Sequence, residues 1–333
     1  MTVVSPHPQL PSEVRLTDVV RATGVPDLIE ILADRLTEPE LVAVLRDAYR
    51  RRAGRMTAPD VLAHYQRRAF FHPSPTAAAT MARIDRIAIS IAAAQFEAVE
   101  LAPICPAAAA SALTPVDSGA AWGAGGSCEV VSDCRTALAL EAAVRRRELL
   151  QEGATAEQGV QLCASHRELH APFSAPLRRE YHHRVFGLCH AGNQARQYQF
   201  EITALIEQLS MQLLLLESLR TEGFRIGLVT VMLYHEPDPN LERVVRGEIA
   251  SSLSAAFPKV RLLTESERRA GRGSFAPIGF TIVAEDQIEV EHTIGMGGFT
   301  DWTRRLLGRA EERLLVSQIA TERIGEAFAP GRS

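Results

Sequence analysis

The chain has 333 residues, enough for two domains or one large one. Its formal net charge is −4 and 23% of its residues are charged, so no overall positive field attracts nucleic acid. Apolar residues make up 46%, which is typical of a soluble protein with a hydrophobic core. Five widely spaced cysteines without a C-x-x-C pair argue against a disulfide framework or a structural zinc site.

The sequence carries no recognisable membrane or export signal. Its start, MTVVSPHPQLPSEVR, lacks the basic and apolar regions of a signal peptide. The longest apolar run, near residues 87–94, is far shorter than the ~20 residues of a membrane span. We therefore expect a cytoplasmic protein without a membrane partner.

The first part of the chain is predicted to be helical. Residues 37–40 (TEPE) and 57–60 (TAPD) each begin with threonine and carry an acidic residue three positions later, which is typical of a helix start. A third helix is expected after Pro75, with Met81, Ile84 and Ile87 at helical spacing. We predict a helical N-terminal region over 1–76 and a second unit over 77–333.

The remaining sequence alternates between strand and helix patterns. A half-buried strand is expected over 96–103, a loop over 106–127, and a turn over 295–298. Strand follows strand without a helix at several points, which predicts an α+β fold with a mixed, mostly antiparallel sheet flanked by helices. The other expected strands are 129–133, 161–169, 183–188, 226–233, 260–264, 280–284, 288–294 and 314–319, and the other expected helices are 137–150, 200–220, 241–257, 301–307 and one from 321.

Two acidic residues are candidate metal ligands. Glu289 and Glu291 alternate with apolar residues, so both carboxylates are expected on one face of the 288–294 strand. Such a pair fits either a solvated sheet edge or a Mg²⁺ site that supports a nucleotide phosphate. The sequence leaves both interpretations open.

Several segments in a fixed order together suggest a family. A helix that ends at Phe96 is followed by the strand FEAVELAP (96–103), which ends in proline. EVVSDCRTALALEAA (129–143) reads as a strand, a turn and a helix. Taken with the later segments, residues 77–326 resemble the catalytic core of class II aminoacyl-tRNA synthetases, nearest to the histidyl type. The resemblance makes Asp133 and Thr136 substrate-binding residues, while Cys134 stands where the family has the glutamate that holds the amino group.

The strand pair 161–169 and 181–192 resembles motif 2 of that family. The resemblance places Arg167 at the arginine that grips the α-phosphate of ATP. In the family pattern F-R-x-E, the glutamate is then replaced by Leu169. Arg167 has a plain alternative, which is a surface residue paired with Glu168.

Two later segments extend the resemblance. GGFTD (297–301) is similar to the G-G-R-Y-D turn of histidyl enzymes, which makes Gly297, Gly298 and Asp301 substrate-binding residues. LLVSQIATERI (314–324) is similar to motif 3, which places Glu322 and Arg323 at the ATP site, with Arg323 as the γ-phosphate arginine. The plain alternative for Arg323 is a helix-start residue that pairs with a neighbouring glutamate.

The resemblance implies a dimeric enzyme that forms an aminoacyl adenylate and pyrophosphate from an amino acid and ATP. Arg167, Arg323 and Mg²⁺ would neutralise the charge of the phosphates. The family's histidine-selective R-G-L-D-Y-Y segment is absent, so a histidyl-tRNA synthetase is not expected. We expect an aminoacyl ligase or aminoacyltransferase that acts on a small molecule, a carrier or a tRNA end. Two alternatives stay open: a transferase that uses the acceptor end of aminoacyl-tRNA without ATP, and a non-catalytic regulatory protein that senses an amino acid.

Overall fold

An eight-stranded sheet forms the centre of the computed structural model, which describes residues 16–67, 71–114, 128–153, 158–169, 182–266 and 275–330. The strand order is β1-β4-β5-β10-β9-β8-β6-β7. Neighbouring strands are antiparallel except at the two edges, where β1–β4 and β6–β7 are parallel. The predicted α+β class with a mixed, mostly antiparallel sheet is confirmed. The strands are β1 (Glu97–Ala98), β4 (Val160–Leu169), β5 (His182–Asn193), β6 (Val229–His235), β7 (Val260–Ser266), β8 (Ile278–Glu285), β9 (Glu291–Thr300) and β10 (Glu312–Ile319).

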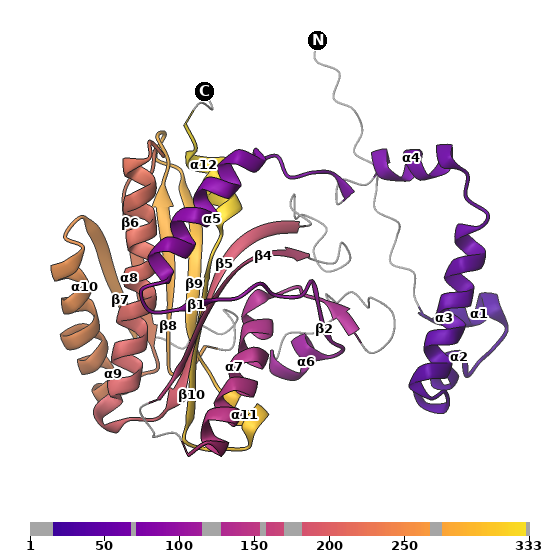
Figure 1. Ribbon diagram of the computed structural model, residues 1–333, viewed down its shortest axis with the longest axis horizontal. Helices are drawn as coiled ribbons and strands as arrows, with labels where there is room; N and C mark the ends of the chain where they lie inside the picture. Colours follow the sequence, from indigo (N-terminus) through magenta and orange to yellow (C-terminus); the bar gives the residue numbers. More distant parts are fainter. Residues whose placement is uncertain are drawn as a thin grey trace, which may run out of the picture.

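Helices cover both faces of the sheet (Figure 1). One face, called here the α7 face, packs against α7 (Cys134–Gln151), with α6 (Ala109–Leu113) and α11 (Trp302–Leu307) beside it. The opposite α8 face packs against α8 (Gln199–Thr221), with α5 (Ala78–Ala92), α12 (Thr321–Phe328) and the run α9 (Pro239–Val244), η4 (Val245–Ala250) and α10 (Ser251–Ala256). Successive residues of a strand point to opposite faces, so the two layers receive alternate side chains.

Helix α8 is the longest helix of the described chain and the most apolar. By length and composition it could cross a membrane, but 61% of its apolar window is buried inside the protein. Its contact with the sheet is partly polar: Gln212 donates a hydrogen bond to Ser317 Oγ (2.8 Å), and Ser317 Oγ donates to Gln208 Oε1 (2.6 Å). All three side chains are fully buried. Helix α8 is therefore a core helix held to β10 by a buried polar ladder.

The N-terminal helices lie beside the sheet, away from the core (Figure 1). They are α1 (Leu16–Thr23), α2 (Leu28–Glu30), η1 (Ile31–Arg35), α3 (Glu38–Ala53) and α4 (Ala58–Arg67), and none of their described residues is buried. The predicted helix starts are confirmed. Thr37 and Glu40 form a reciprocal capping box, and Thr57 and Asp60 make the same contacts at α4.

Four local predictions are wrong, and the first two concern residues 96–127. The strand expected over 96–103 has only two residues, because β1 pairs with β4 at Leu162 and Cys163 alone. The 106–127 region is not a loop throughout: α6 lies within it, and 115–127 falls outside the described residues. Ile104–Pro106 (β2) and Cys128–Val130 (β3) form a separate two-stranded sheet.

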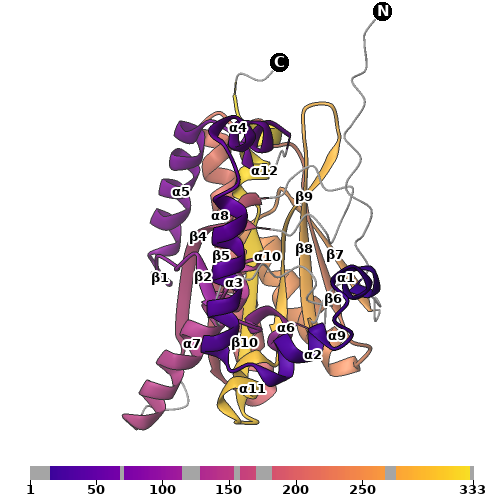
Figure 2. The ribbon, with the colours of Figure 1, turned by 90° about the vertical axis from the view of Figure 1, so that its right-hand side faces the viewer.

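The other two corrections concern the segment around Glu289 and the glycines that follow it. Its strand starts at Glu291, and Glu289 lies in the preceding turn with φ +62°. Figure 2 shows this hairpin between β8 and β9 extending beyond the neighbouring strands. The glycines at 295–298, expected in a turn, lie inside β9 and pair with both neighbouring strands.

Candidate functional site

The first turn of α7 places charged groups on the α7 face of the sheet. Asp133 is the N-cap residue, and its carboxylate accepts a hydrogen bond from the backbone N–H of Arg135 (2.9 Å). The Arg135 guanidinium turns back to the same carboxylate, with Nε at 2.8 Å and Nη2 at 2.7 Å. A helix N-terminus favours a carboxylate there, because its free N–H groups carry partial positive charge.

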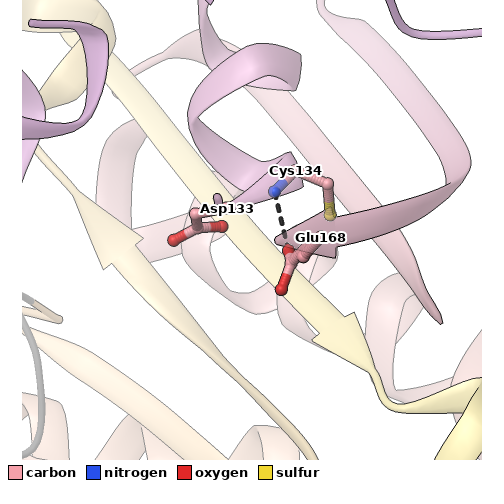
Figure 3. Close-up of side chains that lie close together, drawn as sticks. All are labelled: Asp133, Cys134 and Glu168. Atoms are coloured by element: carbon pink, nitrogen blue, oxygen red, sulfur yellow. Dashed lines mark hydrogen bonds between the residues drawn. The ribbon is translucent and has the colours of Figure 1, made fainter. Parts of the chain in front are cut away.

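Glu168 comes from β4 and meets this helix start from the sheet side. Its Oε1 accepts a hydrogen bond from the backbone N–H of Cys134 (2.7 Å), as drawn in Figure 3. The side chain is almost fully buried, and this burial, reinforced by the charge of Asp133, raises the pKa of Glu168 to about 8. A buried carboxyl group beside another carboxylate therefore holds its proton near neutral pH.

Close backbone packing allows this contact. A side chain at Gly187 of β5 would place its Cβ 2.5 Å from Cys134 Sγ, so the position needs glycine for α7 to approach. From β10, Gln318 Oε1 lies 3.9 Å from the same sulfur. Asp133, Cys134, Arg135, Glu168 and Gln318 make up what we call the α7-face cluster.

One donor of the cluster has no partner within the described part of the chain. Arg135 Nη1 is buried and makes no hydrogen bond there, although Nε and Nη2 are both used by Asp133. The same guanidinium lies over the ring of Phe275, 5.5 Å from its centroid. An unpaired buried donor is costly, which makes Nη1 a candidate contact for an anionic ligand group.

The cluster is poorly suited to a metal ion. Asp133, Cys134 and Glu168 bring possible ligand atoms within 4.8 Å of one another. However, burial raises the pKa of the Cys134 thiol well above its usual range, so the sulfur stays protonated. Arg135 also occupies both oxygens of Asp133. A cation in this space would have to displace the guanidinium.

Arg167 lies on the opposite face of the sheet. Its Nη1 is 2.8 Å from Glu322 Oε2 and 2.8 Å from His182 Nδ1. Glu322, in the first turn of α12, also accepts hydrogen bonds from the backbone N–H of Arg184 (2.7 Å) and from the Ser74 hydroxyl. The plain alternative for Arg167, an ion-paired residue, is thus met in part, although its partner is Glu322 and not Glu168.

Arg323 and the two hairpin glutamates lie apart from the cluster. Arg323 is exposed on α12 and donates to the backbone carbonyl of Thr293 (2.8 Å). Glu289 and Glu291 are both exposed, one in the turn and one on the strand, so the expected shared strand face does not exist. Metal binding at these two residues stays a prediction without that geometric support.

The other predicted substrate-binding residues are spread over the fold. Thr136 is buried, and its hydroxyl donates to the carbonyl of Asp133 (2.8 Å), so it stabilises the first turn of α7. Gly297 faces β10, where a Cβ would lie 2.3 Å from Ser317 Cβ, and Gly298 faces Phe275. Asp301 is exposed at the start of α11, 3.7 Å from Arg305. Only Asp133 belongs to the α7-face cluster.

Sequence reasoning missed Arg135 and Glu168, although the family pattern contained the signal. In F-R-x-E the arginine and the glutamate are two residues apart, so both lie on one face of a strand. Glu168 is on the α7 face with the cluster, and the residue two before it is His166. A one-residue shift therefore aligns the family's glutamate with Glu168 and its arginine with His166.

The architecture agrees with solved structures of known proteins, although no family model and no curated protein matches the sequence. Histidyl-tRNA synthetase from Staphylococcus aureus superposes with a TM-score of 0.54 at 10% identity, over 74% of this chain and 64% of that one. A protein from Bacillus halodurans named as an ATP phosphoribosyltransferase regulatory subunit/histidyl-tRNA synthetase gives 0.54 at 9% identity, over 75% and 79%. The chain has a class II synthetase-like core.

The same core occurs with other amino-acid specificities. A putative threonyl-tRNA synthetase from Aeropyrum pernix gives a TM-score of 0.53 at 12% identity, over 74% of this chain and 58% of that one. The present chain thus spans less than two thirds of the length of the two full synthetases. At these identities the likeness concerns the fold, and activity has to be argued from the residues.

Proposed function

We propose that the synthetase-like core binds a free amino acid at the α7-face cluster and acts as a regulatory sensor. One observation carries the proposal: acidic and basic groups meet on the α7 face, whereas Arg167 is ion-paired on the opposite face. The cluster can recognise both ends of an amino acid. A triphosphate needs several cations on one face, and among the described residues of this cluster Arg135 is the single one.

The chemistry of the cluster suits a zwitterion. Glu168 offers a carboxyl oxygen to an α-ammonium group, Asp133 holds the Arg135 guanidinium in place, and Arg135 Nη1 offers a donor to an α-carboxylate. The ammonium and carboxylate groups of the ligand would exchange their hydrogen bonds to water for hydrogen bonds to charged side chains. Such hydrogen bonds are stronger in a buried site than on the surface. Because the pKa of Glu168 is raised, its carboxyl group holds a proton near neutral pH. This proton would pass to the solvent when an ammonium group binds.

ATP fits the described residues less well. Arg167 shares its charge with Glu322, and Arg323 extends to the carbonyl of Thr293. Gln318 stands in the motif 3 strand where the family has glycine, and its side chain reaches toward Cys134. These positions favour the regulatory alternative over the ligase and transferase that the family resemblance first suggested. The Bacillus halodurans neighbour carries a regulatory-subunit name, which is compatible with such a role.

The proposal is tested by titrating the purified chain with each of the twenty amino acids, with and without ATP, and by measuring ATP–pyrophosphate exchange. We expect one amino acid to bind without ATP and no exchange with any of them. Arg135→Gln should weaken that binding about tenfold or more, because a charge-assisted contact is lost. The matched control is Arg261→Gln, which removes an exposed arginine from the edge strand β7 and should leave the affinity unchanged.

The opposite results would support the enzyme. Exchange that depends on one amino acid, and that is lost in Arg167→Ala or Arg323→Ala, would establish adenylation and reject the sensor. Binding of aminoacyl-tRNA in place of the free amino acid would support the transferase. Binding of Mg²⁺ and of a partner subunit stay separate proposals.

A further inference from the structure

A cavity of the structure is lined in part by α11. Its volume is about 570 Å³, and it lies between the turn before α8, the end of β9 and the start of β10. Protein cavities that hold small molecules commonly measure about 300–1,000 Å³. Its wall includes the α8-face residues Glu201 and Phe299, so it is separate from the α7-face cluster.

Buried polar groups in its wall lack partners among the described residues. Glu201, in the first turn of α8, is 4% exposed, and its Oε2 makes no hydrogen bond. The Thr300 hydroxyl, at the end of β9, is likewise buried and unpartnered. The nearest cation is Arg313, whose Nε lies 3.5 Å from Glu201 Oε1. A hydrogen-bond donor from a ligand would satisfy these oxygens, which are costly to leave unpaired.

The other two nitrogens of Arg313 are engaged elsewhere. Nη1 donates to the carbonyls of Ala310 (3.0 Å) and Glu312 (2.9 Å), and Nη2 donates to Gln194. Burial raises the pKa of Glu201, and Arg313 opposes this shift only in part. Glu201 Oε2 therefore remains open to a donor, and a cationic donor there would favour the ionised form of the carboxyl group.

The mouth of the cavity carries the opposite charge. Arg196 and Arg304 are exposed and line it, and neither guanidinium group has a hydrogen bond or ion pair within the described part of the chain. Tyr198 and Phe299 add aromatic surface to the wall. Gln197 and Tyr198 both adopt left-handed backbone, at φ +55° and +61°, a conformation that is unfavourable for such residues and that gathers at binding sites.

We propose that this cavity binds a second zwitterion, an α-amino acid or dipeptide with a large apolar side chain. Its ammonium group faces Glu201 and Thr300, its carboxylate faces Arg196 and Arg304, and its side chain packs beside Tyr198 and Phe299. A phosphate ligand would meet the carboxylate of Glu201, and a simple cation would meet the arginines at the mouth. The mixed charges are thus matched by a molecule that carries both.

The probes are L-phenylalanine, alanyl-phenylalanine, phenethylamine and 3-phenylpropionate, titrated calorimetrically into the full chain. Every titration uses the Arg135→Gln background, which weakens binding at the α7-face cluster about tenfold and so separates the affinities of the two sites. We expect L-phenylalanine or the dipeptide to bind at least about tenfold more tightly than the amine or the acid alone. Glu201→Gln should weaken binding about tenfold. Glu217→Gln, on the same helix and outside the cavity wall, should leave the affinity as it is.

Three results would overturn the proposal. The first is no saturation by L-phenylalanine or the dipeptide. The second is equal affinity for 3-phenylpropionate, which would show a general anion site. The third is unchanged binding in both Glu201→Gln and the double variant Arg196→Gln/Arg304→Gln. None of these results decides the α7-face proposal, because the variants that are compared all change residues of the cavity wall.

Discussion

The two faces of the sheet hold similar residues in different states. On the α8 face, Glu322 receives donors from Ser74, Arg167 and the backbone of Arg184, so its oxygens are satisfied. On the α7 face, Arg135 has a buried nitrogen without a partner in the described chain. A satisfied group holds two elements together, whereas an unsatisfied one has binding capacity left. The comparison indicates a structural role for Glu322 and a recognition role for the α7-face cluster.

The largest effect is expected at the ion pair of Arg146 and Glu312, whose hydrogen-bonding groups are also satisfied. It joins α7 to β10, and both side chains are fully buried. Arg146 also donates to Asn193 Oδ1 (2.9 Å) and to the carbonyl of Gln158. Arg146→Ala strands a buried carboxylate and should lower the free energy of unfolding by about 3–5 kcal/mol. Urea unfolding measures this, and a loss no larger than that of a surface substitution would contradict the comparison.

Glu322→Gln should have the next largest effect. The amide keeps the shape but loses the charge that Arg167 and the backbone of Arg184 share, which should cost about 1–3 kcal/mol of unfolding free energy. Glu242→Gln is the control, because its pair with Arg246 is half-exposed and should contribute no more than about 0.5 kcal/mol. If Glu322→Gln also abolished amino-acid binding at unchanged stability, Glu322 would be a recognition residue and the comparison would fail.

A pH titration sharpens the comparison on the α7 face. The pKa of Glu168 is raised to about 8 in the folded chain from an ordinary value of 4.5, so the folded state holds this proton more tightly. The stabilising contribution is complete below pH 4.5 and is lost as the pH rises toward 8, with a slope of at most about 1.4 kcal/mol per pH unit. Glu168→Gln should flatten that part of the stability profile, and an unchanged slope would place the proton elsewhere.

The smallest effect is expected outside the sheet. Thr37→Ala removes the capping box of α3 and should cost that helix about 1 kcal/mol. Because none of the described residues of α3 is buried, the midpoint of core unfolding should not move. Hydrogen exchange resolves the two regions, and faster exchange in the sheet strands would show that the N-terminal helices are coupled to the core.

Much of the fold could be predicted from the sequence because its signals are local. The capping boxes at Thr37 and Thr57 involve contacts within four residues, and the apolar run at 226–233 marks a buried strand whatever its neighbours are. The glycines of β9 show where local signals fail. Gly297 and Gly298 suggest a turn, but they are small because β10 and Phe275 press against them across the sheet.

The site was harder to predict because strand side chains alternate. Shifting an alignment by one residue moves every side chain of a strand to the other face. Arg167 attracted attention by its charge, yet Glu168 is the residue that contacts the start of α7. The partner of Glu168 is a backbone N–H 34 positions earlier in the chain, and Arg135 becomes conspicuous only through the nitrogen that remains unpaired. The family pattern F-R-x-E carried a signal for Glu168, whereas no pattern in the sequence singles out Arg135.

The buried ladder between α8 and β10 has a consequence for how the chain selects one arrangement. Most of the buried surface of α8 is leucine and isoleucine, which would pack almost as well if the helix slid along the sheet by a turn. Gln208 and Gln212 are one turn apart and meet the same hydroxyl, that of Ser317. A slide in either direction would bury at least one amide without a partner. The two glutamines thus fix the position of α8 along the sheet, which packing of apolar side chains alone would leave open.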